Sequence, residues 1–167
     1  MRKYMKTQKI YYDNLPSNIG NCIVAATEGG LCSIRISDNA NYLRDEFSEF
    51  NIVQDKDFIK NYKEVLSAYL NAEIKNIDLP CDMQGTEFKK KVWQELQNIP
   101  CGETRYYSEV ACNIGSPKAY RAVATACSSN PIALVVPCHR VLPRAGGVGQ
   151  YLYGSDIKER LLEMESK

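Results

Sequence analysis

The sequence predicts an α/β domain in the first half of the chain and a mostly α-helical domain with a helix-turn-helix in the second. Two short apolar runs joined by a glycine turn predict a β-hairpin in the first half. The second half instead shows apolar patterns of helical period, bounded by capping residues, glycines and prolines. A chain of 167 residues fits one domain, or two small ones that share an interface. We place the two domains at residues 1–80 and 81–167.

The first half begins with β-structure and continues into a helix. Residues 10–37 are expected to be β-structure, in which the runs 22–26 and 31–36 pair across a Glu-Gly-Gly turn. Residues 56–72 carry apolar side chains at three- and four-residue spacing, which predicts an amphipathic helix. Residues 73–84 have mixed character and contain Pro80, which disfavours a helix through this segment. This segment is therefore the predicted linker.

The second half contains three predicted helices before its last strand. Thr86 is placed to cap the first, and Pro100 ends it. The apolar face of this helix is formed by Phe88, Val92, Leu96 and Ile99. Ser108 is placed to cap a short helix that ends at Gly115, and Ser116-Pro117 then starts another that runs to about residue 128. Two short helices around a glycine turn match a helix-turn-helix, although a structural helical hairpin gives the same pattern.

The last of these helices is rich in alanine, which leaves its surface nearly smooth around Arg121. Such a helix suits tight packing against a neighbouring helix, or close approach to a nucleic-acid groove. Residues 132–136 are expected to form a buried strand that stops at Pro137. A glycine-rich loop at 146–154 follows and matches no nucleotide-binding pattern. The final helix carries Ile157, Leu161 and Leu162 on one face.

Charge is balanced over the chain but not locally. The formal net charge is +1, yet residues 105–152 contain Glu109 as their single acidic residue. The cations of this stretch are Arg105, Lys118, Arg121, Arg140 and Arg144. A local basic patch suits contact with a polyanion, although a solvated surface gives the same pattern. No apolar stretch is long enough to cross a membrane, and no signal peptide is evident. The protein is therefore expected in the cytoplasm, or in the nucleus if its source is a eukaryote.

The cysteines indicate reactivity rather than cross-linking. Seven cysteines and one histidine, in a chain expected inside the cell, give neither a disulfide framework nor a zinc site. We therefore expect no metal and no cofactor. Most of the cysteines are expected to be buried and inert. Cys138 differs, because it lies between Pro137 and the sole histidine, His139, and Arg140 follows.

A base or a cation beside a thiol favours the thiolate, which is the nucleophile. The final helix offers three glutamates that could orient the histidine: Glu159, Glu163 and Glu165. Sulfur is a soft nucleophile that suits acyl carbon, disulfide sulfur or an alkyl group. An adjacent Cys-His pair fits the cysteine hydrolases poorly, because their histidine is distant in sequence.

Several motifs of the second half occur together in a known order. They are GTEFKKKVWQELQNIPCGETRYYSEVA, RAVATACSSNP, VPCHRVL at residues 136–142 and the closing GSDIKERLLEMES. The chain resembles the O6-alkylguanine-DNA alkyltransferases over about residues 85–165, without a long gap. The length of the first half is compatible with the RNase H-like α/β domain of that family, although it carries no signature of it.

The resemblance implies direct reversal of DNA damage with one turnover per molecule. The protein would bind double-stranded DNA, flip an O6-alkylguanine out of the stack and take the alkyl group onto Cys138. His139 would accept the thiol proton through a water, and Glu165 would orient His139. Asn130 would hold the turn that carries Cys138. Tyr107 would help expel the target phosphate and donate to the base as guanine leaves.

The resemblance also implies the DNA and base contacts. Arg121 would fill the space that the flipped base vacates. The other DNA contacts would come from Tyr107, Ser116, Lys118, Ala122 and Arg140. The guanine pocket would be lined at Val141, Tyr151, Leu152 and Tyr153. Leu152 and Tyr153 are bulky where many family members have small residues, so methyl should be handled well and O6-benzyl poorly. A monomer without membrane contact is expected.

Three rival functions remain open at this point. The first is a non-catalytic binder of damaged DNA with the same fold, which the presence of Cys138 disfavours. The second is a transcription regulator that uses the helix-turn-helix alone. The third is a cysteine hydrolase, which would show multiple turnovers. A Cys138→Ser variant separates them, because it should abolish alkyl transfer and keep DNA binding.

Overall fold

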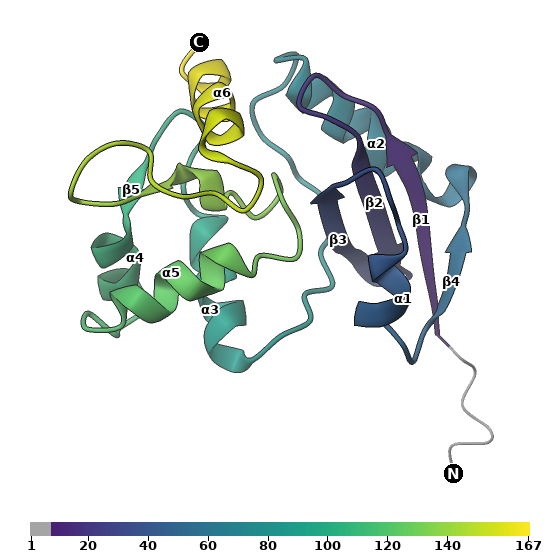
Figure 1. Ribbon diagram of the computed structural model, residues 1–167, viewed down its shortest axis with the longest axis horizontal. Helices are drawn as coiled ribbons and strands as arrows, with labels where there is room; N and C mark the ends of the chain where they lie inside the picture. Colours follow the sequence, from purple (N-terminus) through teal and green to yellow (C-terminus); the bar gives the residue numbers. More distant parts are fainter. Residues whose placement is uncertain (1–7) are drawn as a thin grey trace.

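The structure is a computed structural model and describes residues 8–167. Figure 1 shows a twisted sheet and the helices that pack on it on one side of the molecule, and a group of helices on the other side. The strands are β1 (Lys9–Leu15), β2 (Cys22–Thr27), β3 (Gly30–Ile36) and β4 (Asn51–Gln54), in the sheet order β3-β2-β1-β4. The pairs β1–β2 and β2–β3 are antiparallel, and β1–β4 is parallel.

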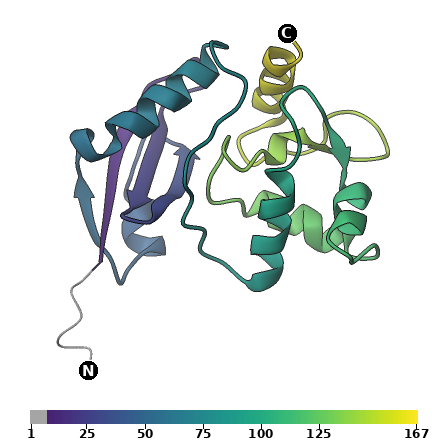
Figure 2. The ribbon, with the colours of Figure 1, turned by 180° about the vertical axis from the view of Figure 1, so that it is seen from behind.

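The predicted hairpin is confirmed as β2 and β3, which meet in the pair Thr27–Gly30. Gly30 has a φ of +140°, and a Cβ there would lie 2.6 Å from the Pro80 carbonyl oxygen. The Leu31 amide donates to that same carbonyl at 2.8 Å. The segment after α2 therefore runs tightly along β3, and Figure 2 shows it between the two halves of the molecule. Pattern reasoning missed β4 and the short helix α1 (Tyr42–Glu46).

Helices cover both faces of the sheet. The predicted amphipathic helix is α2 (Lys56–Leu70), and the Asp55 side chain caps it by accepting from the backbone amides of Asp57 and Phe58. Its buried face packs against one face of the sheet, where the main hydrophobic core lies. That core continues through β3 into the helices of the second half, so the two halves share one interface. A smaller core, with Leu43 and Phe47, lies on the other face.

The second half contains four helices and one two-stranded pairing. The helices are α3 (Glu87–Leu96), α4 (Tyr107–Asn113), α5 (Tyr120–Ser128) and α6 (Ser155–Glu165). The parallel pair is β5 (Arg105–Tyr106) with β6 (Val141–Leu142). Thr86 caps α3 as predicted, because its hydroxyl accepts from the Lys89 amide. Within residues 8–167, no helix has the length and apolar character needed to cross a membrane.

The two helices of the predicted helix-turn-helix are present as α4 and α5, but both predicted caps were wrong. Tyr106 is the residue before α4, and its amide is bound by the Glu109 side chain, so Ser108 lies inside the first turn. The second helix begins at Tyr120 rather than at Pro117. The Ala119 amide bonds to the Ser116 carbonyl at 2.9 Å, which closes a separate turn ahead of the helix.

The strand predicted at residues 132–136 was also wrong. Ile132 forms only an isolated bridge with Ile34 of β3. The chain then turns on itself, because Leu134 has a φ of +73° and the Val136 amide bonds to the Ile132 carbonyl. All five residues are nevertheless buried. An apolar run of five residues therefore identified burial correctly but did not specify extended structure.

Candidate active site

Cys138 begins a single turn of 3₁₀ helix, Cys138–Arg140, after the buried turns that follow α5. Asn130 holds this segment in place. Its amide nitrogen donates to the Val136 carbonyl at 2.7 Å and to the Cys138 Sγ at 3.2 Å. Its amide oxygen accepts from the Ile132 backbone at 2.9 Å. Three hydrogen bonds from one buried side chain therefore fix the direction of the thiol.

His139 is fully buried beside Cys138, and its Nε2 lies 3.1 Å from Oε1 of Glu165, at the end of α6. Because Nε2 faces a carboxylate, we assign the proton of the neutral imidazole to that nitrogen, which leaves the lone pair on Nδ1. Nδ1 is buried and makes no hydrogen bond within residues 8–167. Burial lowers the pKa of His139, although Glu165 opposes this shift. The site therefore holds a neutral histidine with one free basic nitrogen.

Arg140 is bound inside the protein rather than presented to a ligand. Its Nε lies 3.0 Å and its Nη2 2.6 Å from Glu165 oxygens, and its Nη1 donates to the Ile99 carbonyl at 2.6 Å. Only 8% of Arg140 is exposed. Burial would raise the pKa of Glu165, but the bonds from His139 and Arg140 outweigh it and hold that pKa far below its usual range. The prediction of Arg140 as a DNA contact is therefore corrected, because its guanidinium neutralises Glu165.

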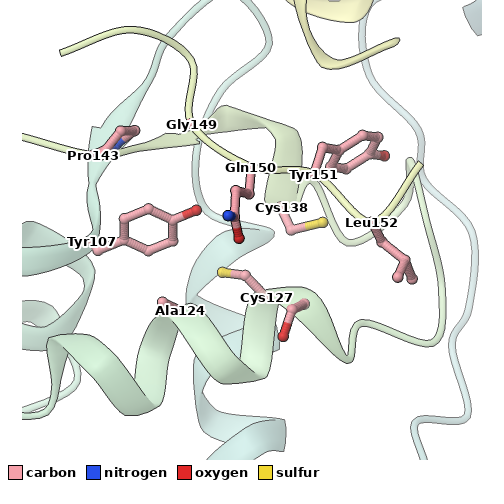
Figure 3. A pocket seen from close by; sticks show the side chains of 10 residues that line it. Tyr107, Ala124, Cys127, Cys138, Pro143, Gly149, Gln150, Tyr151 and Leu152 are labelled. Carbon is pink, nitrogen blue, oxygen red and sulfur yellow. The ribbon is translucent and has the colours of Figure 1, made fainter. Parts of the chain in front are cut away.

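The Cys138 thiol borders a cavity of about 570 Å³ (Figure 3). The cavity lies between α5 and the loop that follows β6, and the start of α4 closes one side. Its lining residues are Tyr107, Ala124, Cys127, Ser128, Cys138, Pro143, Gly149, Gln150, Tyr151 and Leu152. In Figure 3, Cys138 lies between Tyr107 on one side and Tyr151 on the other. The nucleophile is therefore buried, yet open to a space large enough for a planar ring.

Burial raises the pKa of the Cys138 thiol, while Asn130 and Lys158 lower it. Lys158, on α6, is 1% exposed, and its Nζ donates to the carbonyls of Val141 at 2.7 Å and of Gln150 at 3.2 Å. Burial lowers the pKa of Lys158 in turn. The free thiol is therefore mostly protonated, and a base together with a nearby cation is needed to form the thiolate.

Tyr107 is the first residue of α4, and its half-buried side chain lines the cavity. Burial raises the pKa of Tyr107 to about 12. The Lys158 Nζ lies 6.0 Å from the centre of the Tyr107 ring. Tyr107 is therefore a protonated donor at neutral pH, and a cation stands near enough to favour charge on its oxygen.

Three of the four residues predicted for the guanine pocket lie at or beside the cavity. Tyr151 and Leu152 line it, and Leu152 is 57% exposed at its rim. Val141 is fully buried and contributes its backbone, which Lys158 holds. The prediction that Tyr153 lines this pocket is corrected, because Tyr153 lines a neighbouring groove of about 690 Å³ together with Arg35. Tyr153 still packs edge-on against Tyr151, with ring centres 5.5 Å apart.

The predicted DNA contacts of the helix-turn-helix lie on one exposed surface. Arg121 and Ala122 are exposed in the first turn of α5, Lys118 is exposed just before it, and Ser116 is partly exposed in the turn. The opposite side of α5 is buried through Val123, Ala126 and Cys127. The surface that carries Arg121 therefore leads to the cavity, because Ala124 and Ser128 of the same helix line it.

Two family models match this chain almost from end to end. The ribonuclease-like domain of 6-O-methylguanine DNA methyltransferase matches residues 10–83, and the DNA binding domain of 6-O-methylguanine DNA methyltransferase matches residues 87–167. The chain belongs to the 6-O-methylguanine DNA methyltransferase family. The ribonuclease-like fold of the first half is thereby confirmed, although the sequence carried no signature of it.

Known members of the family are similar to most of this chain. A methylated-DNA–protein-cysteine methyltransferase of Methanosarcina mazei is 43% identical, and the match covers 93% of this chain and 97% of that protein. The Escherichia coli bifunctional transcriptional activator/DNA repair enzyme Ada is 40% identical over 89% of this chain, which spans 43% of Ada. The crystal structure of Mycobacterium tuberculosis OGT in complex with DNA has a TM-score of 0.83 and 36% identity, covering 93% of this chain and 92% of that one.

Within this methyltransferase fold, sequence reasoning missed two residues at the cavity. Lys158 lies three residues before Leu161, on the buried face of α6, so helical spacing could have identified it. Cys127 follows Ala126 on the buried side of α5 and carried no separate signal. The expectation of inert, buried cysteines holds only in part, because Cys112 is exposed and Cys81 and Cys101 are half-buried. Among the described residues, no cluster of three or more His, Cys, Asp or Glu is suited to a metal.

Proposed function

We propose that this protein repairs double-stranded DNA by moving the alkyl group of O6-alkylguanine onto Cys138, once per molecule. The observation that carries the proposal is a cysteine thiol at an open cavity with a buried histidine, a candidate general base, as the next residue. The Cys138 thiol borders the cavity, while the next residue, His139, is buried with its Nε2 on Glu165. Relatives named methylated-DNA–protein-cysteine methyltransferase support the reaction, and the DNA complex of M. tuberculosis OGT supports the partner.

The transfer itself is a displacement at the alkyl carbon. His139 Nδ1 takes the thiol proton through a water, because residues adjacent in the chain do not face each other directly. The Cys138 thiolate then attacks the alkyl carbon, the carbon–oxygen bond breaks, and its electron pair stays on the guanine. Tyr107 donates a proton to the base as it leaves, and the proton that His139 accepted returns to the Tyr107 oxygen through water. The products are unmodified guanine and an S-alkylcysteine, and a thioether has no route back to the thiol here, so the protein acts once.

Base flipping brings the buried target atom to the thiol. The O6 atom of a stacked guanine is out of reach of a side chain inside the protein. The smooth, exposed surface of α5 suits close approach to a groove, and Arg121 is the long side chain available to occupy the vacated stack. Residues 81–167 would carry DNA binding and chemistry, and residues 1–80 would support them. We also propose that the protein acts as a monomer in the cytoplasm and needs no cofactor.

Leu152 is proposed to limit the size of the alkyl group. Its side chain lies at the rim of the cavity next to Tyr151. We expect methyl to be transferred quickly, and we expect free O6-benzylguanine to inactivate the wild type slowly. Leu152→Gly should accelerate inactivation by O6-benzylguanine by about ten-fold, because about 1–3 kcal/mol is typical for one pocket contact. A wild-type protein that O6-benzylguanine inactivates as quickly as the variant would contradict the size limit.

The function is tested by intact-mass measurement after mixing the protein with excess O6-methylguanine duplex. The wild type should gain one methyl group, about 14 Da, mapped to Cys138, and then stop. Cys138→Ser should gain nothing and keep its affinity for the duplex. Cys112→Ser is the matched control, because that cysteine is exposed on α4 and borders no part of the cavity, so the variant should behave as the wild type.

Other outcomes identify the rival functions. Binding of damaged duplex without a mass change indicates a damage-binding protein. Tight binding to one DNA sequence, independent of Cys138, indicates a regulator. Repeated turnover of an acyl substrate indicates a hydrolase. Each of these results would overturn the proposal of single-turnover alkyl transfer.

A further inference from the structure

We infer that Tyr69, on α2 of the ribonuclease-like domain, is a positioning residue that sets the orientation and tautomer of His139 through Glu165. The inference rests on the proposed alkyl transfer and concerns how the other domain takes part in it. Tyr69 lies 96 residues before Glu165 in the chain and belongs to the half without reactive groups at the cavity. The proposal gives that half a direct role in the reaction.

The contact is short and completely enclosed. The Tyr69 hydroxyl donates to Oε2 of Glu165 at 2.6 Å, and it lies 3.5 Å from Nε2 of His139. Tyr69 is 1% exposed, Glu165 is 5% exposed and His139 is fully buried. A hydrogen bond to a charged group is shorter and stronger than one between neutral groups. This hydroxyl therefore contacts both partners of the Glu165–His139 pair.

The geometry fixes which atoms carry protons. The Tyr69 hydroxyl has one hydrogen, which it donates in the hydrogen bond to the carboxylate. The lone pairs of the Tyr69 oxygen therefore face Nε2. Nε2–H of His139 then faces two acceptors, namely Oε1 of Glu165 and the Tyr69 oxygen. An unprotonated Nε2 would face two acceptors without a donor. Tyr69 thus adds to the preference for a proton on Nε2, and it keeps Nδ1 available as the base.

Tyr69 also restrains the carboxylate itself. Arg140 contacts both oxygens of Glu165 from one side, with Nε at 3.0 Å from Oε1 and Nη2 at 2.6 Å from Oε2. Tyr69 contacts Oε2 from the other domain. Without it, the carboxylate is free to rotate toward Arg140 and away from His139. The remaining ionisable neighbours of the pair are Cys101, beside Glu165, and Lys158, whose charge reaches His139.

Hydrogen bonds across the domain interface fix the position of Tyr69 relative to α6. Figures 1 and 2 both show the end of α2 close to α6. Arg160 of α6 donates to the Asn18 carbonyl between β1 and β2, and Asn18 donates to the Leu70 carbonyl at 3.2 Å. These bonds connect α6 to the residue next to Tyr69. A shift of the ribonuclease-like domain would therefore move the Tyr69 hydroxyl relative to Glu165.

The experiment compares Tyr69→Phe with the matched control Tyr62→Phe. Tyr62 lies on the same helix and is partly buried, but its hydroxyl has no hydrogen bond among the residues described. The rate constant of methyl transfer is measured against pH for each protein in single turnover. Tyr69→Phe should transfer about ten-fold more slowly, as expected for one hydrogen bond to a charged group. The acid limb of its pH profile should move to lower pH, because a displaced carboxylate supports the imidazolium less and the pKa of His139 falls.

A second measurement, by NMR, determines the tautomer of His139 directly. His139 is the only histidine of the chain, so ¹⁵N-histidine labelling gives the signals of one ring. The wild type and Tyr62→Phe should show a single Nε2-protonated tautomer, and Tyr69→Phe should show a mixture or an altered Nε2 shift. This spectrum is also informative for a weakly stable variant, because folded and unfolded molecules give separate signals.

The outcomes separate this inference from the proposed function. A wild type that gains no methyl overturns the proposed function whatever Tyr69 does. A wild type that gains methyl, together with a Tyr69→Phe variant of unchanged rate, pH profile and tautomer, overturns the inference alone. A lower melting temperature with an unchanged pH profile and spectrum also overturns it, because Tyr69 would then only pack.

Discussion

Glu165→Gln is expected to lower the free energy of unfolding by about 3 kcal/mol and to slow methyl transfer by at least about 100-fold. The change keeps the shape of the side chain but removes its charge. Arg140, which is 8% exposed, would then be a buried cation without a counter-ion. His139 would lose the carboxylate that supports its protonated form. Stability is measured by urea denaturation, and transfer by single-turnover kinetics on O6-methylguanine duplex.

The two effects of Glu165 have different pH dependences. The pKa of Glu165 is lowered in the folded protein from an ordinary value of 4.5, so its contribution to stability is complete above about pH 4.5. That contribution is lost as the pH falls from there toward the lower pKa of the folded state. The stability difference between wild type and Glu165→Gln should therefore be constant near neutral pH and shrink in acid.

Glu163→Gln is the matched control, because Glu163 lies on the same helix and is exposed. It should change stability by less than about 0.5 kcal/mol and leave the transfer rate unchanged. Equal stability of Glu165→Gln and wild type at pH 7 would show that Arg140 finds another partner. Equal transfer rates would show that His139 does not need the carboxylate.

The elements that the sequence predicted well are those whose pattern is local. Helix α2 has the Asp55 cap and a clear apolar face, and the β2–β3 hairpin has glycines at its turn. The strand β4 is four residues long, and its residues pair with β1 residues 42 positions earlier, so the local pattern could not indicate the partner. The run 132–136 failed for the opposite reason, because its burial comes from long-range packing around Ile34 rather than from a ladder of strand bonds.

The site residues show the same contrast between local patterns and distant partners. Cys138 and His139 were identified from their adjacency and chemistry, and the family motifs supplied Glu165, Asn130 and Tyr107. Arg140 was assigned to DNA because a basic stretch is visible in the sequence, whereas its internal partner is 25 residues distant. The sequence pattern placed Tyr69 on the apolar face of a helix. No neighbouring residue indicated that its hydroxyl bonds to the other domain. Adjacency and motifs therefore located the candidate site, but neither they nor charge and periodicity showed which polar groups pair inside it.

Lys158→Met is expected to slow methyl transfer on the order of 100-fold while changing the free energy of unfolding by less than about 1 kcal/mol. Lys158 lowers the pKa of the Cys138 thiol, so its loss leaves burial less opposed and the thiolate scarcer. It also removes the cation 6.0 Å from the ring of Tyr107, where negative charge develops as that hydroxyl donates. Stability changes little because two effects offset each other: the carbonyls of Val141 and Gln150 lose a donor, but a buried charge is removed.

The pH profile distinguishes this electrostatic role from a packing role. The acid limb of methyl transfer should move to higher pH in Lys158→Met, since the thiol pKa rises, and affinity for the duplex should not change. Lys91→Met is the matched control, because Lys91 is an exposed lysine on α3 and does not line the cavity. A Lys158→Met protein with the wild-type rate and pH profile would mean that Lys158 only anchors the loop after β6. In that case the thiolate would depend on His139 and Asn130 alone, and Glu165→Gln should then have the larger kinetic effect of the two.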